Sequence, residues 1–226
     1  MLRHSQRYGV SVRSFHIRTF TFILCSILAM PVFAKSVTIV ALGDSLTAGY
    51  QLPASAALPA VLERNLRAKG LDLQIQNAGV SGDTASGGLE RLDWAVGDDV
   101  DGVIVALGAN DMLRGVDPAQ TEKALGRIIH RLQERGIDVL LVGMLATPSL
   151  GPEYVKSFNA IYPRLAEQRG VSLYPFILEG VAQRPKLHLP DGIHPNREGV
   201  EVVAKAMGPS VERFVAQIKA RKAVKQ

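Results

Sequence analysis

The chain has 226 residues, enough for one domain and a targeting segment but too few for two ordinary domains with separate cores. Of its 26 Lys and Arg residues, four lie in residues 1–34, so the rest carries 22 against 21 Asp and Glu. This near-neutral balance gives no reason to expect a nucleic-acid partner. The sole cysteine, Cys25, also lies in residues 1–34, so the remaining chain has no disulfide, no sulfur ligand for a metal and no cysteine nucleophile.

Residues 1–34 have the three parts of a secretory signal peptide. A stretch with four arginines and no acidic residue precedes an apolar run from Phe20 to Val32, and small or modest side chains follow up to Ala34. We therefore expect cleavage after about Ala34, a periplasmic or secreted protein, and no stable membrane insertion of the mature chain. An N-terminal membrane anchor is the alternative, but a run of roughly 15 residues is short for a span, which needs about 20.

The mature chain, residues 35–226, contains five short apolar runs. Several are continuous stretches of Val, Ile and Leu, as is typical of strands that are buried on both faces of a parallel sheet. The runs are Val37–Leu42, Leu73–Gln76, Gly102–Leu107, Ile137–Gly143 and Val171–Tyr174. They predict a parallel sheet of about five strands.

Helical patterns lie between these runs. Apolar residues repeat at helical spacing over Leu58–Leu66, and Asp117–Gly136 begins with a capping pattern and ends with a glycine. Further helices are expected over Tyr154–Gln168 and Val200–Ile218, and the basic residues from about Lys219 should form a short solvated tail.

Strands that alternate with helices predict right-handed βαβ units in a single α/β domain, with helices on both faces of the sheet. In such sheets, ligands bind at the carboxyl ends of the strands. The residues that directly follow each strand are therefore the first candidates for chemistry.

The first expected strand is followed by Gly43-Asp44-Ser45-Leu46-Thr47. A serine in a tight strand-to-helix turn presents its hydroxyl at the sheet edge, as a nucleophile requires. The pattern differs from the G-x-S-x-G turn of α/β-hydrolases, because Thr47 stands in place of the second glycine. A helix cap or a phosphate-binding turn is the alternative interpretation of Ser45.

Two further polar turns follow the second and third strands. Gly82 lies in Ser-Gly-Asp-Thr, where its backbone N–H can approach a substrate, and Asn110 lies in Gly-Ala-Asn-Asp, where its amide can donate to a developing oxyanion. The alternatives are a plain glycine turn, a helix cap at Asp83 or Thr84, and an Asx-type turn at Asn110.

The fourth block, Asp-Gly-Ile-His-Pro, places Asp191 three residues before His194. The other histidines of the mature chain are His130, in an expected surface helix, and His188, in an expected loop. Asp191 can fold back to accept the Nδ1 proton of His194, as in serine triads. A metal site of His188, Asp191 and His194 is the alternative, although it lacks a characteristic ligand spacing.

Taken together, the four blocks resemble the SGNH (GDSL) hydrolase family, named for its Ser, Gly, Asn and His. These residues correspond to Ser45, Gly82, Asn110 and His194. The resemblance covers roughly residues 37–214 and is closest to a subgroup of periplasmic thioesterases, lysophospholipases and bacterial arylesterases.

The resemblance implies a three-layer α/β/α, flavodoxin-like fold and the hydrolysis of acyl or aryl esters and acyl thioesters, lysophospholipids included. It implies Ser45 as nucleophile, His194 as base and Asp191 as the residue that orients His194. The backbone N–H groups of Ser45 and Gly82, with the Asn110 amide, would form the oxyanion hole. No cofactor or metal is implied, and the expected partner is a small-molecule or lipid ester.

Two departures from the family pattern limit what carries over. Ala109 stands where a second glycine is common, and the segment Met144–Pro152 differs from the subgroup pattern, so acyl-chain preference stays open. The apolar stretch Leu145–Leu150 favours acyl chains mildly. An O-deacetylase of carbohydrates or cell-wall polymers is the alternative enzyme, and a binding protein without activity is the alternative outside enzymes.

Overall fold

The computed structural model describes residues 1–2, 9 and 36–224. The expected signal peptide, with Cys25 and its cleavage site, lies outside the described residues except for residues 1–2 and 9, and so does Lys225 in the basic tail. No helix among the described residues combines the length and the apolar character that crossing a membrane requires.

Five parallel strands form one sheet in the order β2-β1-β3-β4-β5, which is the flavodoxin-like order. The strands are β1 (Val37–Gly43), β2 (Leu73–Gly79), β3 (Gly102–Ala106), β4 (Asp138–Val142) and β5 (Ser172–Tyr174). The prediction of a five-stranded parallel sheet in one α/β domain is confirmed.

The register of the sheet aligns the carboxyl ends of three adjacent strands, β2, β1 and β3. Gly43, the last residue of β1, pairs with Gly79 of β2 and with Ala106 of β3. β2 runs past its expected end at Gln76 because it stays paired with β1 to this point. The segments that follow these three strands therefore start side by side.

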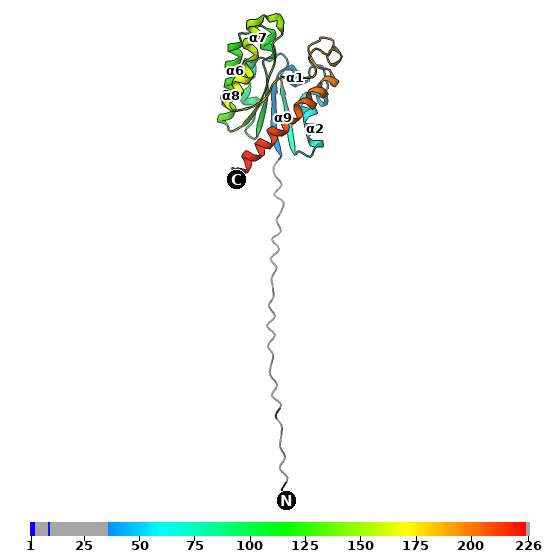
Figure 1. The fold of residues 1–226 in the computed structure, drawn as a ribbon, viewed down its shortest axis with the longest axis vertical. Helices are drawn as coiled ribbons and strands as arrows, with labels where there is room; N and C mark the ends of the chain where they lie inside the picture. Colours follow the sequence, from blue (N-terminus) through cyan, green and yellow to red (C-terminus); the bar gives the residue numbers. More distant parts are fainter. Residues whose placement is uncertain (3–8, 10–35, 225–226) are drawn as a thin grey trace. The chain divides into compact units, whose positions relative to one another are not determined.

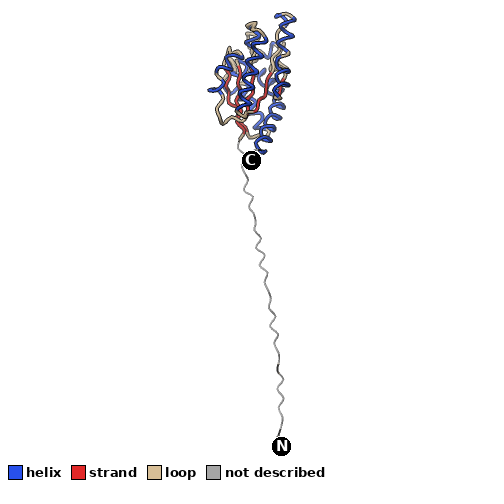
Figure 2. The backbone as a smooth tube through the Cα atoms, turned by 90° about the vertical axis from the view of Figure 1, so that its left-hand side faces the viewer, coloured by secondary structure: helices blue, strands red, loops and turns tan. Residues whose placement is uncertain are grey.

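Helices cover both faces of the sheet (Figures 1 and 2). One face packs against α2 (Leu58–Ala68) and α9 (Arg197–Val224). The opposite face packs against α3 (Ala85–Glu90), α4 (Leu92–Ala95), α6 (Pro118–Glu134), α7 (Pro152–Asn159) and α8 (Ile161–Arg169).

Side chains of β1 alternate between the two layers, with Ile39 in the α2–α9 core and Val40 and Leu42 in the other. This is the three-layer arrangement that the sequence predicts. Short elements complete the chain at the loops: α1 (Ser45–Ala48), α5 (Ala109–Leu113) and the 3₁₀ turns Ala54–Ala56, Pro148–Leu150 and Pro185–Leu187.

The single helix expected over Tyr154–Gln168 is wrong. The chain instead forms α7 and α8, which meet at Ala160. Pro163 has no N–H to donate to the Asn159 carbonyl, and its ring would collide with that carbonyl in a continuous helix. The break therefore falls one turn before the proline.

The basic C-terminal residues also differ from the expected solvated tail. α9 continues to Val224, and Arg221 Nε donates to Asp138 Oδ2 at 2.7 Å. Lys222 Nζ donates to Asp101 Oδ1 at 2.6 Å. Because Asp101 and Asp138 stand at the amino ends of β3 and β4, these pairs hold the end of α9 against the edge of the sheet opposite to the expected site.

Candidate active site

Ser45 is the first residue of α1 and directly follows β1 and Asp44. The turn is tight, because a Cβ on Gly43 would lie 2.0 Å from Thr47 Oγ1. The N-cap is Asp44, whose Oδ1 accepts from the backbone N–H of Leu46 at 3.0 Å. Ser45 therefore does not cap the helix, and its hydroxyl is free to face the sheet edge.

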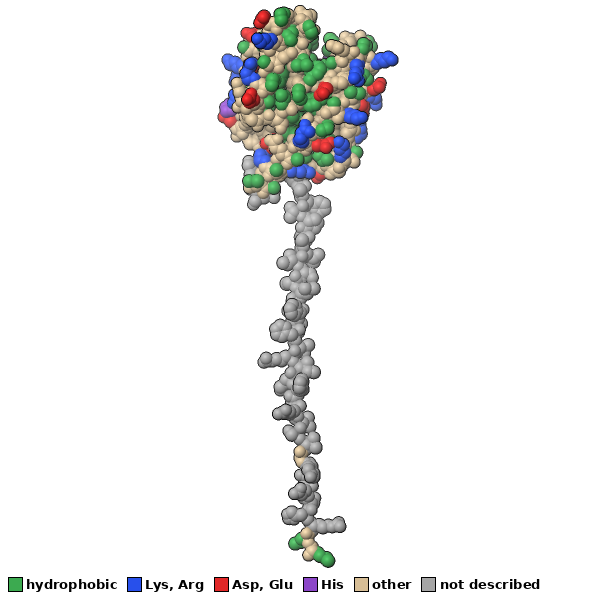
Figure 3. Space-filling view, viewed as in Figure 1, with side chains coloured by type: hydrophobic (Ala, Val, Ile, Leu, Met, Phe, Trp, Pro, Cys, Tyr) green, Lys and Arg blue, Asp and Glu red, His purple; other side chains and the backbone are tan. Residues whose placement is uncertain are grey.

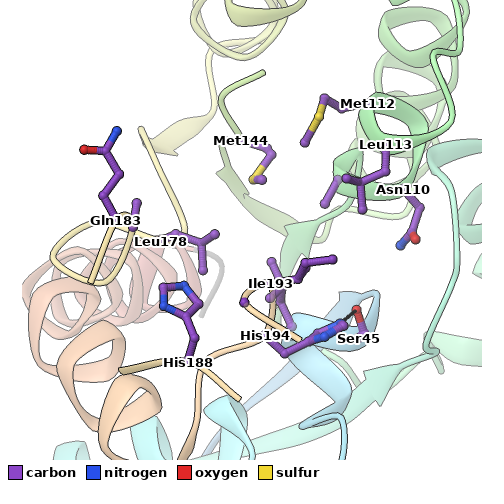
Figure 4. Close-up of a pocket in the computed structure, with 14 residues that line it drawn as sticks. Ser45, Asn110, Met112, Leu113, Met144, Leu178, Gln183, His188, Ile193 and His194 are labelled. Atoms are coloured by element: carbon purple, nitrogen blue, oxygen red, sulfur yellow. Dashed lines mark hydrogen bonds between the residues drawn. The ribbon is translucent and has the colours of Figure 1, made fainter. Parts of the chain in front are cut away.

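That hydroxyl meets His194. The Ser45 Oγ and the His194 Nε2 lie 2.9 Å apart (Figure 4). His194 Nδ1 lies 2.7 Å from Asp191 Oδ2. A carboxylate only accepts, so the proton of the imidazole belongs on Nδ1 and leaves Nε2 as an acceptor for the serine hydroxyl. The structure thus brings together three of the predicted site residues in one chain of hydrogen bonds.

The Asp191 carboxylate, which orients the His194 ring, is itself fixed by backbone hydrogen bonds. Its Oδ1 accepts from the N–H groups of His194 at 3.0 Å and Ile193 at 2.9 Å. The backbone and ring hydrogen bonds from His194, with that from Ile193, lower the pKa of Asp191 from 3.8 to about 2. The carboxylate therefore stays ionised at neutral pH and can support a positive charge on the imidazole.

The predicted oxyanion donors lie at the same edge. Gly82 has a φ of +86°, a conformation that side-chain-bearing residues rarely adopt. Asn110 is the second residue of α5, and its Nδ2 donates to the Asp83 carbonyl at 3.0 Å and lies 3.4 Å from Asp44 Oδ2. The amide thus bonds across to other segments, and the Asx-type turn is wrong.

These groups retain donor capacity. Among the hydrogen bonds of the residues that the structure describes, neither the Ser45 N–H nor the Gly82 N–H has an acceptor. One hydrogen of the Asn110 amide is fixed by Asp83, and the other makes only the long contact with Asp44. Two backbone donors and one side-chain donor are therefore available to an anionic oxygen beside Ser45.

Asp44 and Tyr50 are two residues of the site that sequence reasoning missed. Asp44 is 1% exposed, and burial raises its pKa from 3.8 to about 6 although Leu46 donates to it. The Tyr50 ring packs on the His194 ring at a centroid distance of 4.4 Å. Asp44 stands in the serine motif, but sequence alone does not show whether its carboxylate turns outward or beneath the site.

The residues after Gly82 have separate roles. Thr84 caps α3 by accepting from the Gly87 N–H at 3.2 Å, which confirms the capping interpretation for this residue. The Asp83 carboxylate instead pairs with Arg91, whose Nε lies 2.6 Å from Asp83 Oδ2. No sequence signal singled out Arg91, because an arginine in a helical stretch is usually a surface residue.

A cavity of about 270 Å³ opens beside Ser45, Asn110 and His194. Apolar side chains form most of its wall, among them Met112, Leu113, Met144, Leu178 and Ile193. Figure 4 shows Leu178, Gln183 and His188 on one side and Asn110, Met112 and Leu113 on the other. The upper edge of the domain is notched between α7 and the loop after β5, and hydrophobic side chains gather below the notch (Figure 3).

The segment Met144–Pro152 contributes only Met144 to this wall. The stretch Leu145–Leu150 does not line the cavity, so its apolar character is not evidence for an acyl pocket. The apolar lining comes instead from α5, from the loop after β5 and from the loop that carries His194.

The three side chains of the alternative metal site do not point to one common position. His188 Nδ1 is bonded to the Arg184 carbonyl at 3.0 Å, whereas Asp191 and His194 are bonded to each other. In the part of the chain that the structure describes, no three His, Cys, Asp or Glu side chains gather as metal ligands. Asp191 and His194 are instead aligned with the Ser45 hydroxyl, and His188 is not.

Comparisons with known proteins agree with this geometry. The profile of the GDSL-like lipase/acylhydrolase family matches residues 41–202. Thioesterase 1/protease 1/lysophospholipase L1 of Escherichia coli strain K12 is 39% identical over 191 residues, which cover 80% of this chain and 86% of the relative. An arylesterase of Vibrio mimicus is 38% identical over 177 residues, which cover 78% of this chain and 84% of the relative. The crystal structure of AlinE4, an SGNH-hydrolase family esterase, matches with a TM-score of 0.68 and 44% identity, over 80% of this chain and 97% of its own.

Proposed function

The chain belongs to the GDSL-like lipase/acylhydrolase family and is an ester and thioester hydrolase, and we propose that Ser45 is its nucleophile. The observation that carries this proposal is the chain of hydrogen bonds from Ser45 Oγ through His194 to Asp191. His194 Nε2 takes the hydroxyl proton while Ser45 Oγ attacks the carbonyl carbon of the substrate. Asp191, ionised, keeps the other proton on Nδ1 and stabilises the imidazolium.

The tetrahedral intermediate places a negative charge on the former carbonyl oxygen. The N–H groups of Ser45 and Gly82 and the second hydrogen of the Asn110 amide donate to it. Because that hydrogen otherwise makes only a 3.4 Å contact with Asp44, its hydrogen bond to the oxyanion replaces no short hydrogen bond.

The intermediate collapses when the bond from the carbonyl carbon to the leaving oxygen or sulfur breaks. His194 gives its Nε2 proton to the departing alcohol or thiol, and the acyl group remains esterified to Ser45. A water molecule then loses a proton to His194 and attacks the acyl-enzyme, which releases the carboxylic acid and restores the Ser45 hydroxyl. Every step uses protein groups and water.

We propose acyl and aryl esters and acyl thioesters, including lysophospholipids, as substrates. Apolar side chains line the cavity beside Ser45, as a hydrocarbon chain or aryl ring requires. The names of the relatives, thioesterase, lysophospholipase and arylesterase, point to the same classes.

The test is a fluorophosphonate probe followed by a substrate panel on the purified mature chain. We expect labelling on Ser45, located by peptide mass spectrometry, and turnover of aryl esters, acyl-CoAs or lysophospholipids. Turnover confined to acetylated sugars would instead identify an O-deacetylase. A chain that neither labels nor turns over any ester would contradict the proposal.

We also propose that residues 1–34 are a signal peptide and that the mature enzyme is periplasmic or secreted. The basic stretch, the apolar run and the small residues up to Ala34 support this. Mass spectrometry of the protein recovered from periplasmic and culture fractions tests this proposal. The mass should correspond to a chain that begins at about residue 35. An intact N-terminus on protein recovered from the membrane fraction would favour the anchor.

A further inference from the structure

Arg91 lies beneath the loop that carries Gly82, at the junction between α3 and α4. It is only 7% exposed, although its guanidinium is charged. Two short hydrogen bonds compensate the charge: Nε donates to Asp83 Oδ2 at 2.6 Å, and Nη2 donates to the Gly43 carbonyl at 2.9 Å. Arginine is rarely buried to this extent in proteins unless its charge is paired, so a buried arginine between two short helices calls for an explanation.

The two partners of Arg91 belong to different parts of the expected oxyanion hole. Gly43 ends β1 two residues before Ser45, and Asp83 directly follows Gly82. The Asp83 carbonyl also receives the hydrogen bond from the Asn110 amide at 3.0 Å. One guanidinium therefore connects the backbone segments that place all three proposed donors.

Other contacts also link these segments, namely the β1–β2 pairing that ends at Gly43 and Gly79 and the Asn110 amide between Asp44 and Asp83. The β1 end and the Gly82 loop share the bond from the Val80 N–H to the Gly43 carbonyl, 3.0 Å long, which that carbonyl accepts together with the bond from Arg91. The Gly82 carbonyl accepts from Arg114 Nη2 at 2.7 Å, but from the solvent side of the loop. Arg91 adds a buried side-chain link that reaches past the end of the strand pairing to Asp83.

Stabilisation of an oxyanion depends on donors that are fixed before charge develops. The planar fork of an arginine can hold two acceptors at a set separation, whereas a lysine ammonium concentrates its donors at one point. A lysine at this position can pair with Asp83 but cannot reproduce both bonds in the same geometry.

We propose that Arg91 is a positioning residue that sets the geometry of the oxyanion hole by tying the β1 end to the Gly82–Asp83 loop. The inference rests on the proposed role of Ser45 and extends it to a residue that does not touch substrate.

The test is Arg91→Lys in the mature enzyme. The charge of Asp83 stays paired, so we expect the melting temperature to change little. Misplacement of the donors should lower kcat by roughly 10- to 100-fold, as small displacements in active sites do, and KM should change much less. Arg164→Gln, which breaks an exposed pair with Glu122 far from the site, is the matched control and should leave kcat unchanged.

A double-mutant cycle with Asn110→Ala separates positioning from general damage. If Arg91 acts through the donors, the Arg91→Lys effect on kcat should be smaller by a factor of about 2 or more once the Asn110 amide is gone. Equal effects in both backgrounds, or a change in KM alone, would overturn the proposal. If Arg91→Lys does not fold, Asp83→Asn serves instead, because it keeps the side-chain size and the backbone carbonyl while removing the ion pair.

Failure of this inference differs from failure of the proposed function. If Ser45→Ala abolishes turnover but Arg91→Lys behaves like Arg164→Gln, Ser45 remains the nucleophile and Arg91 is only structural. If Ser45→Ala retains turnover, the proposed function itself is wrong.

Discussion

The Ser45 hydroxyl and the His194 imidazole meet at 2.9 Å although 149 positions separate them in the chain. Ser45 is placed by the turn between β1 and α1, and His194 by the loop that precedes α9. That loop is fixed by two backbone bonds to the segment before it, from the Leu189 N–H to the His194 carbonyl and from the Asn196 N–H to the Leu187 carbonyl. The contact between Ser45 and His194 thus depends on the two turns that place these residues. The Ser45 side chain itself contributes nothing to the packing of the core.

Ser45→Ala should consequently abolish activity while the fold survives. Removal of the nucleophile should lower kcat by roughly three or more orders of magnitude, in line with triad deletions. The melting temperature should change little, because the hydroxyl packs in no core and, among the described residues, bonds to His194 alone. Hydrolysis of p-nitrophenyl esters and thermal unfolding measure the two quantities.

Ser149→Ala, in an exposed 3₁₀ turn, is the control and should retain full activity. Full activity of Ser45→Ala on the same esters would remove Ser45 from the mechanism.

The sheet was predictable because several of its strands are continuous apolar runs and because the runs alternate with helical patterns. The predicted helix over Tyr154–Gln168 was wrong because the helical spacing of apolar residues outweighed Pro163 in our interpretation. The interpretation of the tail failed for a different reason. Pairing of Arg221 and Lys222 with Asp138 and Asp101 depends on tertiary placement, which composition does not contain.

At the site, the motif residues were predictable, because each follows a strand and carries a recognisable chemical group. The supporting residues were not. Asp44 and Arg91 act through burial and through contacts with distant backbone, the Gly43 carbonyl in the case of Arg91. Nothing in the local sequence distinguishes such an arginine from a solvated one.

Asn110→Ala should separate oxyanion stabilisation from structure. Loss of one preorganised donor typically costs roughly 10²–10³ in kcat, or about 2.7–4 kcal/mol. KM should move much less, because the bond strengthens only as charge develops. Steady-state kinetics and a melting curve of the same variant provide the comparison.

The variant also leaves the Asp83 carbonyl without its 3.0 Å partner, so a modest loss of stability is expected as well. A large fall in melting temperature with near-normal kcat would mean that Asn110 serves the fold and not the reaction.

Asp191→Asn should inactivate the enzyme through the tautomer of His194. The asparagine oxygen would keep the bonds from the Ile193 and His194 N–H groups, which turns its NH₂ group toward Nδ1. The ring must then carry its proton on Nε2, where it can no longer accept from Ser45. We expect kcat to fall by roughly 10³- to 10⁴-fold.

Asp99→Asn, at an exposed position away from the site, is the matched control for this exchange.

Chelators should leave the wild-type enzyme unaffected. Strong inhibition by EDTA that zinc reverses would instead favour the metal interpretation of His188, Asp191 and His194.

The final prediction concerns stability and the buried carboxyl of Asp44. Burial raises its pKa from 3.8 to about 6, against the bond from Leu46 and the nearby charge of His194, with Asp111 and Asp83 adding to the rise. Between about pH 4 and pH 6, the folded protein therefore keeps a proton at Asp44 that the unfolded chain has released. This contribution to stability is fully present below about pH 4 and is lost as pH rises through about 6.

Wild type should accordingly lose stability between pH 4 and pH 7 through this group, and Asp44→Asn, which cannot ionise, should not. A shift of about two pKa units corresponds to at most about 3 kcal/mol. Denaturant unfolding at the two pH values measures how the free energy of unfolding changes with pH.

Asp117→Asn is the matched control, because Asp117 caps α6 in the same way from an exposed position. Asp191 does not interfere, since its lowered pKa affects stability only as pH falls from about 4 to about 2. Identical slopes for wild type and Asp44→Asn would show that Asp44 is ionised throughout this range.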